Sequence, residues 1–341
     1  MEKFKVAFVG FRHSHIDGLY TRMKDSEQYT IVAACEENAE AAAAAKERGI
    51  DITYTNFHEM MMECDFDILA IGDYFGIRGA RAISALVAGK HVIADKPLCT
   101  SLAELREIRH LAQTRNLKVG CMLDMRLNAN INAAKNVIDS GRMGEIHAIS
   151  FGGQHPISYG TRPAWYFEQG KQGGTINDIA IHGLDAVEYM TGHTITELTA
   201  ARTWNAFATW APVVFQDAAQ GMFALDNKCG VMFDVSYFAP EKTGFANPFY
   251  WRFTIWGTKG VIEYKLNGGP NSKTIDSDDG ALVQVALDGT DGFVAYPKEK
   301  YPVTPLGEFL KEIRGEETII TTADVLRTSR EVLTVQAVAD K

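Results

Sequence analysis

Residues 92–98 read Val92-Ile93-Ala94-Asp95-Lys96-Pro97-Leu98, an apolar run that leads directly into a lysine and a proline. The apolar part predicts a buried strand, and the residue before a proline is restricted toward extended backbone. Lys96 is therefore expected at the carboxyl end of a strand, where α/β sheets place their ligands. From these residues alone, a surface lysine at the end of a strand is an equally good interpretation.

The sequence around this stretch alternates between short apolar runs and helical patterns. Strand-like runs end at Val9, Cys35, Gly72 and Met122, and amphipathic or alanine-rich segments separate them. This alternation predicts an α/β fold with a doubly wound parallel sheet. We assign residues 1–122 to this domain and residues 123–341 to a second domain.

Composition narrows the class of protein. The chain has 341 residues, 46% of them hydrophobic, and a net charge of −9 without a cluster of lysine and arginine, which argues against a nucleic-acid partner. The first apolar run, residues 4–9, is too short for a signal peptide or a membrane span. We expect a cytoplasmic protein with a small-molecule ligand and no membrane partner. The five scattered cysteines do not form a zinc pattern.

A strand, a tight turn and a helix start lie at the beginning of the chain, over residues 5–23. Gly10 permits the turn, and the N–H groups of a helix start can bind a pyrophosphate. Arg12 and His15 occupy the second and third glycine positions of the dinucleotide fingerprint, so the motif alone is a weak signal. We expect Arg12 and the histidine rings to replace lost backbone contacts. The predicted pyrophosphate-binding residues are Gly10, Phe11, Arg12, His13 and His15.

Glu36 follows the apolar run 30–35 at a distance that suits an acid accepting hydrogen bonds from ribose hydroxyls. Because Glu37 and Asn38 come next, without an arginine, a 2′-phosphate would meet negative charge. The sequence therefore favours NAD over NADP. The predicted cofactor site also includes Asp73, Tyr74, Asp95 and Lys96.

The pair His13 and His15 also suggests a metal site. Two histidines separated by one residue do not share a helical face, and the neighbouring sequence offers no third ligand. We therefore predict that no metal is bound.

The whole chain resembles the glucose-fructose oxidoreductase, inositol dehydrogenase and rhizopine-catabolism (Gfo/Idh/MocA) family. The resemblance rests on the glycine turn, the acid after the second strand, the stretch from Ala88 to Leu98 and the stretch from Gly173 to Asp185. It implies a C-terminal α+β domain with a large, mostly antiparallel open sheet, closing helices that can pack back on the first domain, and a homodimer or homotetramer formed through that sheet. Asp95 stands where the family usually has glutamate.

The second of these stretches carries the predicted chemistry. Asp178, His182 and Asp185 have the spacing i, i+4 and i+7, which places them on one face of a helix. A carboxylate one turn from a histidine can fix its tautomer and support it as a general base. The alternative is a structural helix with a lone histidine, and the presence of Lys96 in the family order argues against it.

The resemblance implies reversible hydride transfer between nicotinamide and a secondary alcohol or ketone of a sugar, inositol or related polyol. His182 would accept the hydroxyl proton, Asp178 would support it, and Lys96 would polarise the same oxygen. Arg126 lies where family members often have an arginine near the site, and the resemblance implies that it contacts the cofactor, although a surface charge is an equal alternative. The predicted substrate-binding residues are Lys96, His155, Arg162, Trp165, Tyr166, Asp178 and His182, of which Trp165 and Tyr166 could equally be core residues.

Two other functions stay open. Some relatives of this fold use NAD to cleave glycosides through transient oxidation. The degraded glycine turn would also fit a catalytically silent, dinucleotide-binding regulatory protein.

Residues 267–279, rich in Gly, Asn, Ser and Asp, predict a loop or hairpin.

Overall fold

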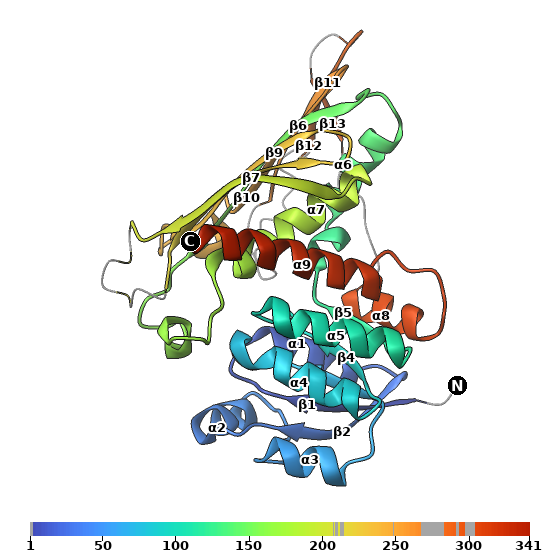
Figure 1. Cartoon of the computed structure of the whole chain (residues 1–341), viewed down its shortest axis with the longest axis vertical. Helices are drawn as coiled ribbons and strands as arrows, with labels where there is room; N and C mark the ends of the chain where they lie inside the picture. The colour runs from blue at the N-terminus through green and yellow to red at the C-terminus, as the bar shows by residue number, and fades with distance from the viewer. Residues whose placement is uncertain are drawn as a thin grey trace. The chain divides into compact units, whose positions relative to one another are not determined.

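The computed structural model in Figure 1 describes residues 3–206, 208, 211, 215–247, 249–266, 283–290, 293–296 and 304–341. The predicted loop or hairpin at residues 267–279 lies outside the described residues. The chain divides into two compact units. Unit 1 comprises Met1–Met122, Pro163–Gly173 and Pro305–Arg330, and unit 2 comprises Leu123–Arg162, Gly174–Thr304 and Glu331–Lys341.

Unit 1 contains a five-stranded parallel sheet with the strand order β2-β1-β3-β4-β5. The strands are β1 (Phe4–Val9), β2 (Tyr29–Cys35), β3 (Ile68–Ile71), β4 (His91–Ala94) and β5 (Val119–Cys121). Both faces are covered, so the middle residues of these strands are fully buried. The strand order reverses between β1 and β3, which is where doubly wound sheets bind ligands. The predicted Rossmann-type sheet is confirmed.

The helices of unit 1 begin at well-defined caps. Side chains of Asn38, Asn56 and Ser101 accept hydrogen bonds from the backbone N–H groups of Ala41, Glu59 and Glu104 at 2.9, 3.2 and 3.1 Å. These caps set the ends of the connecting loops. The helices are α1 (His15–Lys24), α2 (Ala39–Glu47), α3 (Phe57–Glu63), α4 (Phe75–Val87), α5 (Leu102–Thr114) and α8 (Pro305–Ile313).

The units depart from the predicted division after residue 122 because two later segments belong to unit 1. The short helix η2 (Ala164–Phe167) packs its aromatic side chains on Phe75. Helix α8 packs on β5, where a ring atom of Phe309 lies 2.7 Å from the position that a Cβ on Gly120 would occupy. Only glycine allows this close approach. Helix α9 (Thr322–Ala339) is divided between the two units after Arg330.

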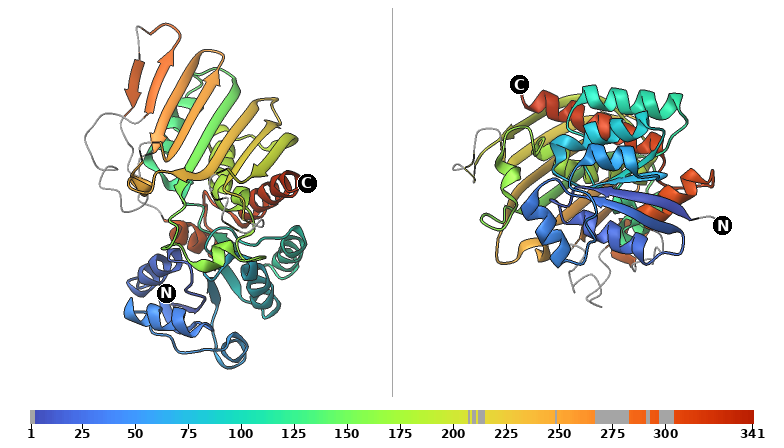
Figure 2. Two further views of the ribbon diagram at one scale, coloured as in Figure 1. Left: turned by 90° about the vertical axis from the view of Figure 1, so that its left-hand side faces the viewer. Right: turned by 90° about the horizontal axis from the view of Figure 1, so that it is seen from below.

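Unit 2 is built on an eight-stranded sheet with the order β13-β12-β11-β10-β6-β9-β8-β7 among the described residues (Figure 2). Every pairing is antiparallel except that of β6 with β9. The predicted large, mostly antiparallel sheet is therefore confirmed. Its strands are β6 (Ile146–Pro156), β7 (Ile195–Trp204), β8 (Ala218–Leu225), β9 (Gly230–Ala239), β10 (Trp251–Gly257), β11 (Gly260–Leu266), β12 (Val283–Leu287) and β13 (Phe293–Tyr296).

The two faces of this sheet differ in their side chains. On one face Phe151 stacks on Phe233 and Phe253, with ring centroids 5.4 and 5.5 Å apart, and helices α6 (Ala129–Asp139) and α7 (Ile181–Thr191) pack against the sheet. At alternate positions, which point to the other face, large apolar side chains are exposed, namely Met222 on β8, Met232 on β9 and Trp256 on β10. A short helix, η1 (Asp124–Leu127), precedes α6, and a π-helical turn, η3 (Ile176–Ala180), precedes α7.

Candidate active site

The turn between β1 and α1 lies beside the end of β2. Gly10 has a φ of +80°, and a Cβ at this position would collide with Asp73. The buried carboxylate of Glu36 accepts hydrogen bonds from the backbone N–H groups of Phe11 at 2.6 Å and Asn38 at 2.8 Å. The acid is thus held next to the turn, at the edge of the sheet where such folds bind dinucleotides.

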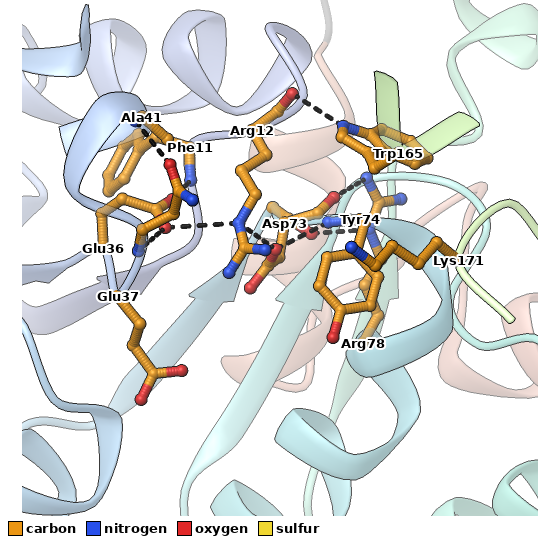
Figure 3. A network of polar contacts seen from close by, with 12 residues as sticks. Phe11, Arg12, Glu36, Glu37, Ala41, Asp73, Tyr74, Arg78, Trp165 and Lys171 are labelled. Atoms are coloured by element: carbon orange, nitrogen blue, oxygen red, sulfur yellow. Dashed lines mark hydrogen bonds and ion pairs between the residues drawn. The ribbon is translucent and has the colours of Figure 1, made fainter. Parts of the chain in front are cut away.

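Arg12, at the second glycine position, bridges two acids (Figure 3). Its Nε lies 3.3 Å from Oε1 of Glu36 and 3.0 Å from Oδ1 of Asp73. The guanidinium carbon lies 4.9 Å from the centre of the Tyr74 ring. Burial raises the pKa of Asp73, and the positive charge of Arg12 opposes this shift. Arg12 therefore places a positive charge beside both Glu36 and Asp73.

A second arginine reaches the acids after β2. Arg81 on α4 forms an ion pair with Glu37, and its guanidinium carbon lies 4.0 Å from the centre of the Phe57 ring. No arginine stands next to these acids in the sequence, but Arg81, 44 residues from Glu37 and on another element, brings one there in the structure. Each of the two arginines, Arg12 and Arg81, is matched by a carboxylate.

A buried cluster forms around Asp95 at the end of β4. His13 Nδ1 lies 2.7 Å from Asp95 Oδ2, and His15 Nδ1 lies 3.2 Å from Oδ1. The guanidinium of Arg78 donates to Oδ2 at 2.9 Å. His13 Nε2 lies 3.1 Å from the hydroxyl of Tyr166, which comes from the segment 163–173. The structure thus brings together predicted site residues from three distant parts of the sequence.

The protonation states in this cluster follow from burial and charge. Burial lowers the pKa of His13 to about 4, although Asp95 acts in the opposite direction. For Asp95 burial acts to raise the pKa, but the charge of Arg78 and the two histidines outweigh it and hold the pKa well below its usual range. At neutral pH His13 is neutral and Asp95 is ionised.

The same cluster is a candidate metal site. Ligand atoms of His13, His15 and Asp95 all lie within 4.8 Å of one another. Asp95 is thus the third potential ligand that the sequence near the histidines does not show, because it follows a different strand. A cation would compete for this carboxylate with the buried guanidinium of Arg78, whose own charge would repel it.

Arg78 holds the turn that carries Lys96. It donates to backbone carbonyls at 2.6–3.2 Å, those of Gly72, Asp73, Asp95, Lys96 and Pro97. Lys96 is buried, and its Nζ lies 6.0 Å from the centre of the Phe75 ring. Sequence reasoning missed Arg78. The available signal was an arginine among apolar residues on the buried face of α4.

Trp165 and Tyr166 belong to the aromatic core of unit 1. Both side chains are buried and pack with Phe75, and the two rings stack with centroids 4.1 Å apart. The indole Nε1 of Trp165 donates to the carbonyl of Arg12 at 3.3 Å. These contacts favour the core interpretation of Trp165, and a substrate contact for Tyr166 remains a prediction.

In unit 2 the predicted α-helix from Asp178 to Asp185 is partly wrong. Residues Ile176–Ala180 form a π-helical turn, so the α-helical i, i+4 spacing does not apply across it. The hydroxyl of Tyr237, on β9, donates to Oδ2 of the buried Asp178. Tyr237 is a site residue that the sequence did not indicate, because β9 is distant in sequence.

The other two residues of this stretch contact η1. His182 Nδ1 lies 3.5 Å from Oδ1 of Asp124. Asp185 receives a bidentate ion pair from Arg126, with distances of 2.9 and 2.6 Å. Arg126 is buried, so its interpretation as a surface charge is wrong, and its contact with a cofactor remains a prediction.

A set of rings surrounds His155 in unit 2. Its ring centroid lies 5.1 Å from that of Tyr250, and Arg162 places its guanidinium carbon 5.1 Å from the ring of Tyr237. Arg162 also donates to the carbonyls of Ile157 at 2.7 Å and Pro156 at 2.6 Å. Its guanidinium is therefore engaged by the local backbone.

Tyr250 is another site residue that sequence reasoning missed. Burial raises its pKa, the negative charges of Asp124 and Asp178 raise it further, and Arg162 acts in the opposite direction. Tyr250 is therefore a protonated hydroxyl at neutral pH, and Asp124, one of the carboxylates that act on it, also lies 3.5 Å from His182 Nδ1. Lys96 belongs to unit 1 whereas Asp178 and His182 belong to unit 2, so a shared site for them remains a prediction.

The chain is similar in sequence to two known oxidoreductases. Levoglucosan dehydrogenase of Pseudarthrobacter phenanthrenivorans is 27% identical over 183 residues, which cover 52% of this chain and 45% of that protein. The 1,5-anhydro-D-fructose reductase of Ensifer adhaerens is 28% identical over 178 residues, which cover 50% of this chain and 51% of that protein. The chain spans about half the length of these relatives.

The fold is shared by an oxidoreductase from Agrobacterium radiobacter solved in complex with NAD+, L-tartaric acid and magnesium. The TM-score is 0.77 at 20% identity, covering 100% of this chain and 97% of that one.

Among the residues described here, every helix is too short or too polar to traverse a bilayer.

Family profiles match both parts of the chain. The profile described as an oxidoreductase family with an NAD-binding Rossmann fold matches residues 4–122. The profile of the GFO/IDH/MocA C-terminal domain matches residues 131–263. Together they confirm the resemblance, and the protein belongs to the Gfo/Idh/MocA family of oxidoreductases.

Proposed function

We propose that this protein is an NAD-dependent oxidoreductase acting on a secondary alcohol or ketone of a sugar, inositol or related polyol. The observation that carries this proposal is that Gly10, Glu36, Asp73 and Lys96 all follow the carboxyl ends of adjacent parallel strands. An acid for the ribose hydroxyls and a fixed cation at this edge suit a dinucleotide. The names of the relatives, a sugar dehydrogenase and a sugar reductase, support the substrate class.

We favour NAD over NADP as the cofactor. Two backbone N–H groups hold the carboxylate of Glu36 in place. Its remaining lone pairs can accept hydrogen bonds from the ribose hydroxyls. Arg12 and Arg81 are each paired with a carboxylate, which weakens their attraction for a 2′-phosphate. Dissociation constants for NADH and NADPH, measured by fluorescence transfer from the protein, test this preference, and equal affinities would contradict it.

The proposed roles follow from side-chain chemistry. The cofactor, when bound, accepts or donates the hydride at C4 of nicotinamide. His182 accepts the hydroxyl proton with support from Asp178. Lys96 holds the same oxygen and stabilises the negative charge that develops on it. The turn held by Arg78 keeps the lysine backbone in place.

Turnover with a panel of polyols tests the catalytic role of Lys96. Lys96→Ala should lower kcat by about 10²- to 10⁴-fold with NADH binding largely intact. The matched control is Lys24→Ala, which removes a lysine from the last turn of α1. Release of sugar from a glycoside without net NADH would instead support the glycoside-cleaving alternative. Failure to bind either dinucleotide would support the silent regulatory alternative.

We also propose that the exposed side of the unit 2 sheet pairs with a second copy of the chain. Met222 and Met232 lie opposite each other on β8 and β9, and both are exposed, as is Trp256 on β10. Contiguous exposed apolar side chains mark association surfaces. Light scattering should give the mass of a dimer or tetramer, and Met232→Lys should reduce it to that of a monomer.

A further inference from the structure

A histidine that acts as a general base needs one ring nitrogen protonated and held, so that the other is free to accept a proton. The proposed function assigns the accepting role to His182 and names Asp178 as its support. Asp178, however, also receives the hydroxyl of Tyr237 and lies in a π-helical turn. A different carboxylate, which lies near Nδ1 of His182, is therefore a candidate for orienting the ring.

That carboxylate is Asp124 of η1. Its Oδ1 lies 3.5 Å from His182 Nδ1. The side chain of His182 is 11% exposed and that of Asp124 is 65% exposed, so the pair connects a buried ring with solvent. Apo distances between a base and its orienting group are often long and shorten when substrate binds.

The backbone around Asp124 is fixed on α7. Arg126, two residues later in η1, forms the bidentate ion pair with Asp185 on α7, and both side chains are buried. Asparagine 132 strengthens this anchor, because the Asn132 side chain donates to the carbonyl of Arg126 at 2.8 Å. The ion pair is three residues along the helix from His182, so it sets the distance between Asp124 and the imidazole.

We propose that Asp124 is a positioning residue that holds His182 in the Nδ1–H tautomer and stabilises its cation. This inference rests on the proposed function for the role of His182. When the substrate O–H bond breaks, the proton passes to Nε2, and the imidazolium that forms is balanced by Asp124.

Two aromatic residues of the described part of unit 2, Tyr250 and Trp251, also belong to the surroundings of this pair. Trp251 on β10 places its ring centroid 6.2 Å from that of His182 and carries no charge. Tyr250 stays protonated because burial and the charges of Asp124 and Asp178 raise its pKa. The charges that act on Tyr250 are those of Asp124, Asp178 and Arg162, and the first of these carboxylates also lies 3.5 Å from His182 Nδ1.

The kinetic test uses the full-length protein with its best polyol. Asp124→Asn should lower kcat about three- to tenfold, leave the KM for NAD unchanged, and move the acidic limb of the kcat profile to lower pH, since loss of a negative charge lowers the pKa of a histidine. Asp124→Glu should restore most of the rate. Asp139→Asn, a change to another exposed acid of unit 2, should match the wild type.

An NMR test needs no substrate. Long-range 15N spectra, with His182 assigned through His182→Gln, should show the Nδ1–H tautomer in the wild type and a shift toward Nε2–H in Asp124→Asn. An unchanged tautomer, or a lower kcat without movement of the acidic limb, would overturn the role of Asp124. If His182→Ala stays fully active, the proposed function itself fails. If His182→Ala is inactive while Asp124→Asn behaves as wild type, only this inference fails.

Discussion

Two histidine–aspartate pairs differ in what surrounds the carboxylate. In unit 1 His13 Nδ1 lies 2.7 Å from Asp95, whose charge is also balanced by the buried Arg78. In unit 2 His182 Nδ1 lies 3.5 Å from the exposed Asp124. Burial keeps His13 neutral down to about pH 4, so its pair serves structure and protonation is costly. The comparison teaches that closeness of histidine and aspartate does not by itself make a general base.

The largest expected effect separates the two histidines by turnover. His182→Ala should lower kcat by about 10²- to 10⁴-fold, because it removes the proposed proton acceptor. His13→Ala should change kcat by less than about tenfold, since a buried neutral ring with a pKa of about 4 is a poor base at neutral pH. Steady-state kinetics at saturating NAD measures both. Equal losses in the two variants would remove the distinction.

The next effect concerns stability and depends on the charge of Arg78, which balances Asp95 in the His13–Asp95 pair. Arg78→Met should lower the free energy of unfolding by about 3–5 kcal/mol, because it leaves the buried Asp95 without its cation. Urea denaturation followed by circular dichroism gives this value. Arg106→Met, at an exposed position on α5, is the control and should lie within about 0.5 kcal/mol of wild type. If Arg78→Met changes the free energy of unfolding only slightly, the buried charge of Asp95 does not need Arg78 as its counter-ion.

A smaller effect should appear in the pH dependence of stability. The folded pKa of His13, about 4, lies below its ordinary value of 6.5, so the unfolded chain binds more protons between these values. The free energy of unfolding should therefore decrease as pH falls from 6.5 to 4, with up to about 3 kcal/mol due to His13. His13→Asn should flatten this slope, whereas His58→Asn, at an exposed position on α3, should leave it unchanged.

The smallest expected effect is metal binding at the first pair. Because Arg78 already neutralises Asp95, zinc should bind at well below one equivalent per chain. Metal analysis after equilibration with zinc and gel filtration measures the ratio. One tightly held equivalent that is lost in His15→Ala would show that His13, His15 and Asp95 form a metal site.

Local sequence signals predicted much of the candidate site. The alternation of apolar runs and helices predicted the parallel sheet, and the positions of Gly10, Glu36 and Lys96 after its strands were readable from it. These features depend on contacts between residues close in sequence or on the period of a single element, which the chain itself displays.

The missed residues share a different property. Arg78, Asp124, Tyr237 and Tyr250 act on partners that are distant in sequence or belong to other elements. The same is true of Arg81, which brings an arginine to Glu37, one of the acids used in the argument for NAD. Arg78 has a weak local signal, its position among apolar residues of α4. The others have none, because a single aspartate or tyrosine has the same sequence context with or without a buried partner.

The sequence by itself determined the class of fold, the family and the order of its chemical residues, since hydrophobic period and short motifs are properties of the chain. Tertiary structure decided the charge states and partners. It neutralised Asp95 with Arg78, lowered the pKa of His13 by burial, and inserted a π-helical turn at Asp178. The physical reason is that desolvation and Coulomb interaction depend on distance in space, which the fold sets and the sequence spacing does not.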